Sequence, residues 1–244
     1  MIAKIQHALV TGGGGFLGRA IIGRLVARDV AVRSLSRGDY PELVALGVET
    51  VRGDVADPGV VAAACRGCDV VIHTAARAGV WGSRRDYEAT NIRGTENVVA
   101  ACLACGAPRL VYTSSPSVVF DGRDMEGVDE RAPYPSKYHA HYPRTKAHAE
   151  RTVLAANSDK LATVALRPHL IWGPRDNHLV PRIIARGRAG RLRRIGRENK
   201  LIDSVYIDNA AAAHLLAAER LSPGSPIAGG AYFITNGEPM PIWE

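Results

Sequence analysis

Long hydrophobic runs are missing from this sequence. No stretch of its 244 residues approaches the roughly 18 uninterrupted apolar residues that a membrane-spanning helix needs. The N-terminus holds Lys4 and His7 within a short apolar run and has no small-residue cleavage site, so it does not indicate a signal peptide. Internal repeats and low-complexity tracts are also absent. We therefore expect no integral membrane segment, a cytoplasmic location, and one domain with at most a smaller appendage.

Acidic residues are outnumbered, with 24 Asp and Glu against 31 Lys and Arg and a net charge of +7. The excess is concentrated between Arg182 and Lys200, where Glu198 is the single acid. Such a run is typical of a solvated helix face followed by a loop. It could instead hold an anionic substrate or partner. Nucleic acid is not expected as a partner, because no recognition motif accompanies the charge.

Cysteines are few, and the four that occur form two C-x-x-C pairs, Cys65 with Cys68 and Cys102 with Cys105. Two such pairs suggest a zinc ribbon. However, an apolar strand and most of a helix lie between them, and each pair sits among alanines. Cysteine in that setting behaves as a small buried hydrophobe. We therefore predict no metal site.

The rest of the sequence alternates strands with helices. Continuous apolar runs or short strand patterns occur at 8–10, 31–35, 49–52, 70–73, 110–112 and 162–166, and helical patterns at 87–105 and 140–156. This alternation predicts an α/β fold, a Rossmann-type doubly wound parallel sheet with right-handed crossovers. We assign 1–167 to a dinucleotide-binding domain. A helix at 208–220 and a strand at 232–234 are assigned to a smaller substrate-side lobe, 168–244, whose elements can interleave with the core.

A glycine loop follows the first strand and opens the first helix. Gly12 permits a tight turn, Gly15 lets the backbone approach a pyrophosphate, and Gly18 lets the helix pack on the strand. The free N–H groups of the helix N-terminus favour a phosphate at this position. Phe16 and Leu17, in the same loop, are also assigned to cofactor binding.

The end of the second strand bears on which dinucleotide binds. An acid there would bind the ribose 2′-hydroxyl and repel a 2′-phosphate, but this sequence has Ser36 followed by Arg37. Because guanidinium matches phosphate geometry, the pair favours NADP(H), with NAD(H) as the alternative. Asp39, the nearest acid, lies one turn too late.

Further cofactor contacts are expected after the next strands. Asp54 and Val55 follow the third strand and face the adenine in one interpretation, while in the other Asp54 caps the helix that begins near residue 58. Three more residues complete the predicted cofactor site: Ala75, Ala76 and Pro168.

The catalytic candidates begin with Tyr142 and Lys146, which share one helix face at i, i+4 spacing. A nearby ammonium favours the phenolate of a tyrosine. Tyr142 could therefore exchange a proton with a carbonyl or hydroxyl, and Lys146 could bind the nicotinamide ribose. Ser115, at the end of the fifth strand, could orient the carbonyl oxygen, with Ser114 as its alternative.

Three histidines lie close to these residues in the sequence. His139 and His141 flank Tyr142, and His73 ends the fourth strand. Each could relay protons. The alternative, loop or hydrogen-bonded histidines without a catalytic role, is the one we favour.

Five stretches together resemble the extended short-chain dehydrogenases/reductases, and more narrowly their 3β-hydroxysteroid dehydrogenase branch, over essentially the whole chain. They are Thr11–Gly18, Tyr112–Gly122, Tyr142–Lys146, Arg167–Pro174 and Tyr206–Asn209. The resemblance implies oxidation or reduction at a β-hydroxy or β-keto position of a large apolar small molecule, such as a 3β-hydroxysteroid or a 2-alkyl-3-oxo acid. It also implies that Asn91 orders the active site.

Two departures from the family pattern stand out. Ser36 replaces the acid of NAD-preferring relatives, and the sequence ends at Glu244 where relatives continue. Residues 238–244 resemble the lead-in to a helix, so we expect an incomplete substrate lobe.

Two other functions remain open. A sugar-nucleotide epimerase or dehydratase would use the same catalytic group, with the basic run 182–200 holding a diphosphate. A dinucleotide-sensing binding protein typically lacks the tyrosine and lysine. A homodimer is the candidate assembly.

Overall fold

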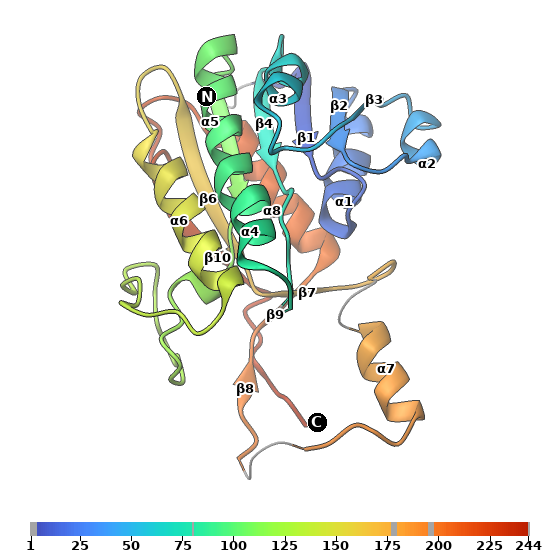
Figure 1. Ribbon diagram of the computed structural model, residues 1–244, viewed down its shortest axis with the longest axis vertical. Helices are drawn as coiled ribbons and strands as arrows, with labels where there is room; N and C mark the ends of the chain where they lie inside the picture. Colours follow the sequence, from blue (N-terminus) through green and yellow to red (C-terminus); the bar gives the residue numbers. More distant parts are fainter. Residues whose placement is uncertain (1–3, 80, 177–179, 195–197, 244) are drawn as a thin grey trace.

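A seven-stranded parallel sheet forms the centre of the protein in a computed structural model, which describes residues 4–79, 81–176, 180–194 and 198–243 (Figure 1). The strand order is β10-β6-β5-β4-β1-β2-β3. Neighbouring strands are parallel throughout, which confirms the predicted doubly wound α/β fold. The strands are β1 (His7–Thr11), β2 (Ala31–Ser36), β3 (Glu49–Arg52), β4 (Val70–His73), β5 (Arg109–Thr113), β6 (Ala162–Pro168) and β10 (Ala231–Ile234).

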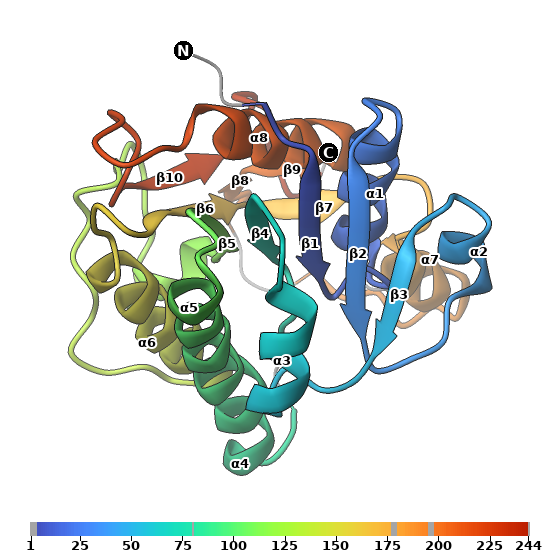
Figure 2. The ribbon, with the colours of Figure 1, turned by 90° about the horizontal axis from the view of Figure 1, so that it is seen from above.

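Helices cover both faces of the sheet, as Figure 2 shows. Alternate side chains of one strand enter two different cores: Ala8 and Val10 of β1 pack with α1 and α8, whereas Leu9 packs with α3, α5 and α6. The central strands β1 and β4 are apolar without interruption at residues 8–10 and 70–72, because both of their faces are buried. These helices are α1 (Phe16–Val26), α3 (Pro58–Cys65), α5 (Gly94–Cys105), α6 (His141–Ala155) and α8 (Ile207–Arg220).

The strand and helix predicted near the end of the chain, β10 and α8, pack with the main sheet and its helices and do not form a separate lobe. Strand β10 pairs with β6, with Ala231 opposite Ala165, and α8 packs against α1. Tyr232 and Ile234 are partly buried against the core, which explains why β10 joins the edge of the main sheet. This part of the predicted substrate-side lobe therefore lies in the Rossmann core.

Smaller elements lie beyond one end of the sheet, where Figure 1 shows α7 and β8 apart from the main body. Strands β7 (Leu170–Trp172) and β9 (Ser204–Tyr206) pair in parallel, and β8 (Leu201–Ile202) pairs antiparallel with β11 (Met240–Pro241). The other short helices are α2 (Pro41–Val44), α4 (Arg84–Tyr87) and α7 (Val180–Arg188). None of the helices in the described ranges has the length and hydrophobicity of a membrane-spanning segment.

The helix predicted over 87–105 is interrupted by a wider turn. Residues Glu88–Arg93 form a π-helical segment between α4 and α5, and α5 ends at Cys105, followed by Gly106 with a left-handed φ of 70°. Segments of this kind occur often at functional sites. Asn91 lies in this one, with its side chain buried.

Candidate functional site

The glycine loop forms a tight cradle between β1 and α1. Gly12 has a φ of 72°, and a Cβ added to it would lie 2.8 Å from the Ala75 backbone. A Cβ on Gly18 would lie 2.3 Å from the Gly12 carbonyl oxygen. Since Gly15 precedes α1 and has no side chain, the first N–H groups of the helix are free to bind an anion. The loop therefore fits the pyrophosphate of a dinucleotide.

A cleft of about 210 Å³ opens beside this loop, at the carboxyl ends of β2, β3 and β4. Eight of the predicted cofactor residues line it: Gly12, Gly15, Ser36, Arg37, Asp54, Val55, Ala75 and Ala76. Leu17 instead packs in the hydrophobic core, because the first turn of α1 directs it toward the sheet. Leu17 and Gly18 thus support the loop from behind.

Sequence reasoning missed several residues of this cleft. Tyr40 lines it and packs on the glycine loop, since a Cβ on Gly14 would lie 2.0 Å from the Tyr40 ring. Thr90 lines the cleft as well, one residue before Asn91. The sequence shows Tyr40 only as an aromatic residue shortly after the second strand. The folded loop is what brings its ring to the glycines.

The structure separates the two interpretations of Asp54. Helix α3 is capped by Asp57, whose Oδ1 accepts hydrogen bonds from the N–H groups of Gly59 at 2.8 Å and Val60 at 3.2 Å. Asp54 accepts a hydrogen bond from the Ala56 N–H at 2.9 Å and lines the cleft. Asp54 is therefore not the helix cap.

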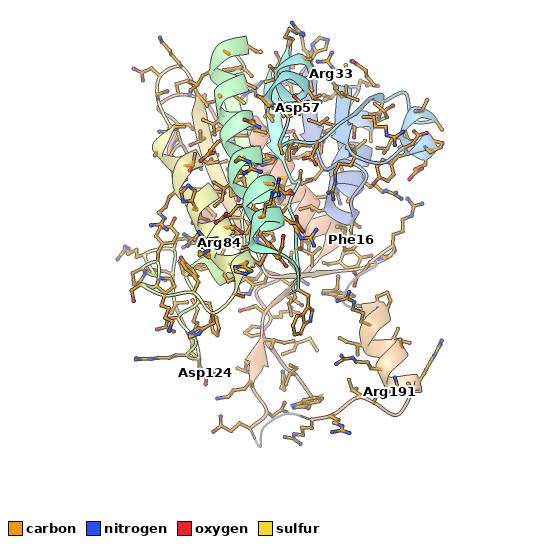
Figure 3. All side chains as sticks on the ribbon, viewed as in Figure 1. Phe16, Arg33, Asp57, Arg84, Asp124 and Arg191 are labelled. Atoms are coloured by element: carbon orange, nitrogen blue, oxygen red, sulfur yellow. The ribbon has the colours of Figure 1, made fainter. Side chains whose placement is uncertain are left out.

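Two of the catalytic candidates, Tyr142 and Ser115, line a second cleft, of about 480 Å³. Tyr142 projects into it from the first turn of α6, and Ser115 from the segment after β5. Phe16 and Pro168, both predicted to bind cofactor, also line it. Figure 3 places Phe16 at the end of α1 nearest β7, so the glycine loop and this cleft adjoin.

Tyr142 is half-buried where it lines the cleft. Burial raises the pKa of Tyr142 above its ordinary value, and a side-chain hydrogen bond with Ser115 opposes the rise. Both serine candidates line the cleft with Tyr142, and the Ser115 hydroxyl lies 2.9 Å from that of Ser117. Ser114 is buried.

Lys146 lies one layer behind the cleft wall. Its Nζ donates a hydrogen bond to the Thr113 carbonyl at 2.5 Å and lies 4.1 Å from the centre of the Tyr112 ring. Burial lowers the pKa of Lys146 to about 7, while Glu150 raises it. That this ammonium favours the Tyr142 phenolate stays a prediction, since burial is the largest influence on the Tyr142 pKa and raises it.

The histidines have different surroundings. His73 is buried, with Nδ1 at 2.6 Å from the Thr11 hydroxyl and Nε2 at 3.0 Å from that of Thr95. Burial lowers the pKa of His73 to about 3, so the ring is neutral at ordinary pH. His139 and His141 are exposed. These positions favour the interpretation without a catalytic role.

The basic run extends away from the sheet. Helix α7 is exposed along its described length, and Figure 3 places Arg191 beyond its end, at the outer edge of the molecule. A solvated helix face is the interpretation that this position favours. Residues 195–197, also part of the run, lie outside the described residues.

The four cysteines lie where α3 and α5 pack together. Cys65, Cys68 and Cys102 are buried, Cys105 is half-buried, and all four are free thiols. Within the described ranges, no group of three cysteine, histidine or carboxylate side chains has the arrangement of a metal site. That the protein binds no metal remains a prediction.

Three features define the class of extended short-chain dehydrogenases/reductases. They are the doubly wound sheet, the glycine loop at its first crossover, and the tyrosine, lysine and serine at its carboxyl edge. Within this class, the chain belongs to the 3-beta hydroxysteroid dehydrogenase/isomerase family, whose model matches residues 9–244.

Curated relatives match nearly the whole chain. The 2-alkyl-3-oxoalkanoate reductase of Shewanella oneidensis is 52% identical over 98% of this chain and 64% of its own length. The human (Homo sapiens) sterol-4-alpha-carboxylate 3-dehydrogenase, decarboxylating, is 38% identical over 98% of this chain and 65% of its own length. The chain thus spans slightly less than two thirds of these relatives.

Solved structures share the fold. The UDP-glucose 4-epimerase of Thermus thermophilus, in complex with NAD, is 30% identical with a TM-score of 0.79. The alignment covers 97% of this chain and 79% of that one. The seven-stranded sheet is therefore that of a dinucleotide-binding enzyme fold.

Proposed function

We propose that this protein is an NAD(P)-dependent oxidoreductase that interconverts a β-hydroxy and a β-keto group on a large apolar small molecule. The observation that carries the proposal is the second cleft, which Tyr142 and Ser115 both line together with Phe16 at the end of the glycine loop. Apolar side chains complete the wall of this cleft: Phe16, Pro116, Pro168, Leu170 and Ile171. A 3β-hydroxysteroid or a 2-alkyl-3-oxo acid fits such a lining, and relatives of this chain are named for substrates of these types.

The chain's own residues would manage the proton and the substrate orientation. A bound nicotinamide would supply or accept the hydride. Ser115 would hold the substrate oxygen beside the Tyr142 phenol. With a pKa above its ordinary value, Tyr142 keeps its proton at neutral pH and can donate it to a ketone oxygen during reduction. Lys146, hydrogen-bonded to the Thr113 carbonyl, would hold the ribose from behind the cleft wall.

For the cofactor we propose NADP(H), with NAD(H) as the alternative because several solved relatives contain NAD. Ser36 and Arg37 line the first cleft at the end of β2. The Ser36 hydroxyl accepts a hydrogen bond from the Gly14 N–H at 3.1 Å, so it stays beside the glycine loop. Arg52 Nε donates to the Arg37 carbonyl at 3.3 Å, which places a second guanidinium at the same corner. This corner would suit a 2′-phosphate.

We propose that the elements after residue 167 that lie outside the main sheet form the substrate side. A cytoplasmic location and a homodimer are the expected context, and light scattering of the purified protein tests the assembly.

A substrate panel tests the function. Reduced cofactor should be consumed with a 2-alkyl-3-oxo acid or formed with a 3β-hydroxysteroid, as followed by nicotinamide absorbance. UDP-glucose should remain unchanged when analysed by chromatography. Conversion of UDP-glucose alone would establish the sugar-nucleotide epimerase instead. Dinucleotide binding without turnover of any panel member would favour the binding protein.

A further inference from the structure

Glu150 continues the helix face that carries the catalytic candidates. It lies one helical turn after Lys146, as Lys146 lies one turn after Tyr142, all on α6. Side chains four residues apart on a helix are neighbours. The Glu150 side chain is 0% exposed, so this carboxylate is fully buried. A buried carboxylate is costly unless it has partners.

Two partners hold the Glu150 carboxylate from outside its own helix. Arg167 of β6 donates from Nε to Oε2 at 3.0 Å and from Nη2 to Oε1 at 2.7 Å. The hydroxyl of Tyr134 donates to Oε1 at 2.6 Å. A bidentate arginine with an added phenol fixes both the position and the plane of the carboxylate.

The arginine itself is fixed by packing. Its guanidinium lies 5.3 Å from the centre of the Phe233 ring and 5.9 Å from that of Tyr134. Its side chain is 3% exposed. Strand β6 and the loop before α6 thus supply the two partners of this carboxylate, and Phe233 of β10 packs on the arginine.

The surroundings of Lys146 show what this carboxylate does. From β5, Lys146 faces the Tyr112 ring and the Thr113 carbonyl, and from β4 it faces His73, which is neutral at ordinary pH. On α6 its neighbours are Tyr142 and Glu150. Burial favours the uncharged amine, and Glu150 is the group that opposes it.

We propose that Glu150 is a positioning residue, whose carboxylate, clamped by Arg167 and Tyr134, favours the protonated form of Lys146 and directs its side chain at the Thr113 carbonyl beside the cleft. The effect of Glu150 on turnover rests on the proposed function. The protonation of Lys146 is a property of the chain itself and is measured without any substrate.

The direct test is a pH titration of the lysine side chains by NMR on ¹³C-labelled protein, with the Lys146 signal identified by its loss in Lys146→Arg. In Glu150→Gln the Lys146 midpoint should fall by about one pH unit, because the amide no longer stabilises the ammonium. Glu150→Asp keeps the charge and should restore most of the midpoint. Glu130→Gln is the matched control. Glu130 accepts a hydrogen bond from the Phe233 N–H at 2.9 Å but is exposed, so it should leave the midpoint unchanged.

A second variant covers the case in which Glu150→Gln does not fold. Replacing Glu150 and Arg167 together by glutamine avoids an uncompensated buried guanidinium. The Lys146 midpoint should again lie below that of the unaltered protein. An unchanged midpoint in whichever variant folds overturns the proposal.

Kinetics then test the catalytic consequence. The alkaline limb of the kcat profile should move to lower pH in Glu150→Gln by the same amount as the Lys146 midpoint. A merely structural residue would lower kcat equally at all pH values, and that result would overturn the positioning role. Absence of turnover with every substrate would instead contradict the proposed function and leave the titration standing.

Discussion

The side-chain amide of Asn91 donates a hydrogen bond to the Thr145 hydroxyl at 3.0 Å, which joins the π-helical segment to α6 between Tyr142 and Lys146. The same side chain accepts from the Arg77 N–H at 2.8 Å and donates to the Arg77 carbonyl at 3.1 Å. Asn91 thus connects the loop after β4 to the helix that carries the catalytic candidates. No local pattern links these three segments.

Replacing Asn91 by alanine should lower both stability and turnover. The half-buried Arg77 backbone would lose two hydrogen bonds and the Thr145 hydroxyl one of three, which should cost about 1–3 kcal/mol of unfolding free energy. Displacement of α6 should also lower kcat. Urea unfolding and steady-state kinetics measure the two effects. Asn157→Ala is the control, because Asn157 accepts a hydrogen bond from the Thr163 N–H at 3.1 Å, away from the clefts. It should affect stability alone, and equal kcat losses in both variants would contradict the role of Asn91.

Tyr142→Phe should abolish most turnover and leave dinucleotide affinity nearly intact. The change deletes the phenolic proton, and general acid–base catalysis typically contributes about 10²–10⁴-fold. Nicotinamide absorbance measures turnover, and fluorescence titration measures affinity. Tyr232→Phe removes a hydroxyl on β10 and should behave like the unaltered protein. Activity of Tyr142→Phe within a few-fold of that control would refute the assigned role.

Arg37→Ala should weaken NADPH binding about tenfold or more and leave NADH binding unchanged. Loss of a charged hydrogen bond to phosphate costs about 1.5–3 kcal/mol, and the exposure of Arg37 favours the lower end. Titration of both cofactors measures the difference. Arg85→Ala, an exposed arginine on α4, serves as the control. Equal affinity of the unaltered protein for NADPH and NADH would show that Ser36 and Arg37 do not select the cofactor.

Acid should destabilise the protein partly through His214. This buried histidine of α8 has Nδ1 at 2.7 Å from the Ala210 carbonyl and Nε2 at 2.9 Å from the Thr113 hydroxyl. Burial lowers the pKa of His214 to about 4, below its value of about 6.5 in the unfolded chain. Between these values the unfolded chain binds the extra proton, so stability falls as the pH falls.

The loss assigned to His214 amounts to about 2 kcal/mol between pH 6.5 and pH 5. Urea unfolding at both pH values should therefore show a smaller acid effect in His214→Gln. His148→Gln, at an exposed site, should retain the full effect. The same acid effect in His214→Gln as in the unaltered protein would refute the assignment.

The purified protein should contain no stoichiometric zinc and should keep its unfolding midpoint after treatment with a chelator. Cys65 and Cys102 lie in the core between α3 and α5, where they pack as small apolar side chains. Elemental analysis checks the metal content. One zinc per chain would overturn this interpretation.

The sequence alone determined the features that depend on neighbours in the chain. Apolar runs fix strands that are buried on both faces, and the glycine spacing fixes the cradle of Gly12 and Gly18. The i, i+4 spacing places Tyr142 and Lys146 on one helix face. These features need only local geometry, so the doubly wound fold could be predicted.

Tertiary structure alone decided what depends on packing between distant segments. In the folded protein β10 pairs with β6, Asp57 and not Asp54 caps α3, and Leu17 is buried in the core. Tertiary structure also paired Glu150 with Arg167 and enclosed Lys146, which burial brings to a pKa of about 7. Charge and desolvation depend on every group that surrounds a side chain, and the linear sequence does not state which groups those are.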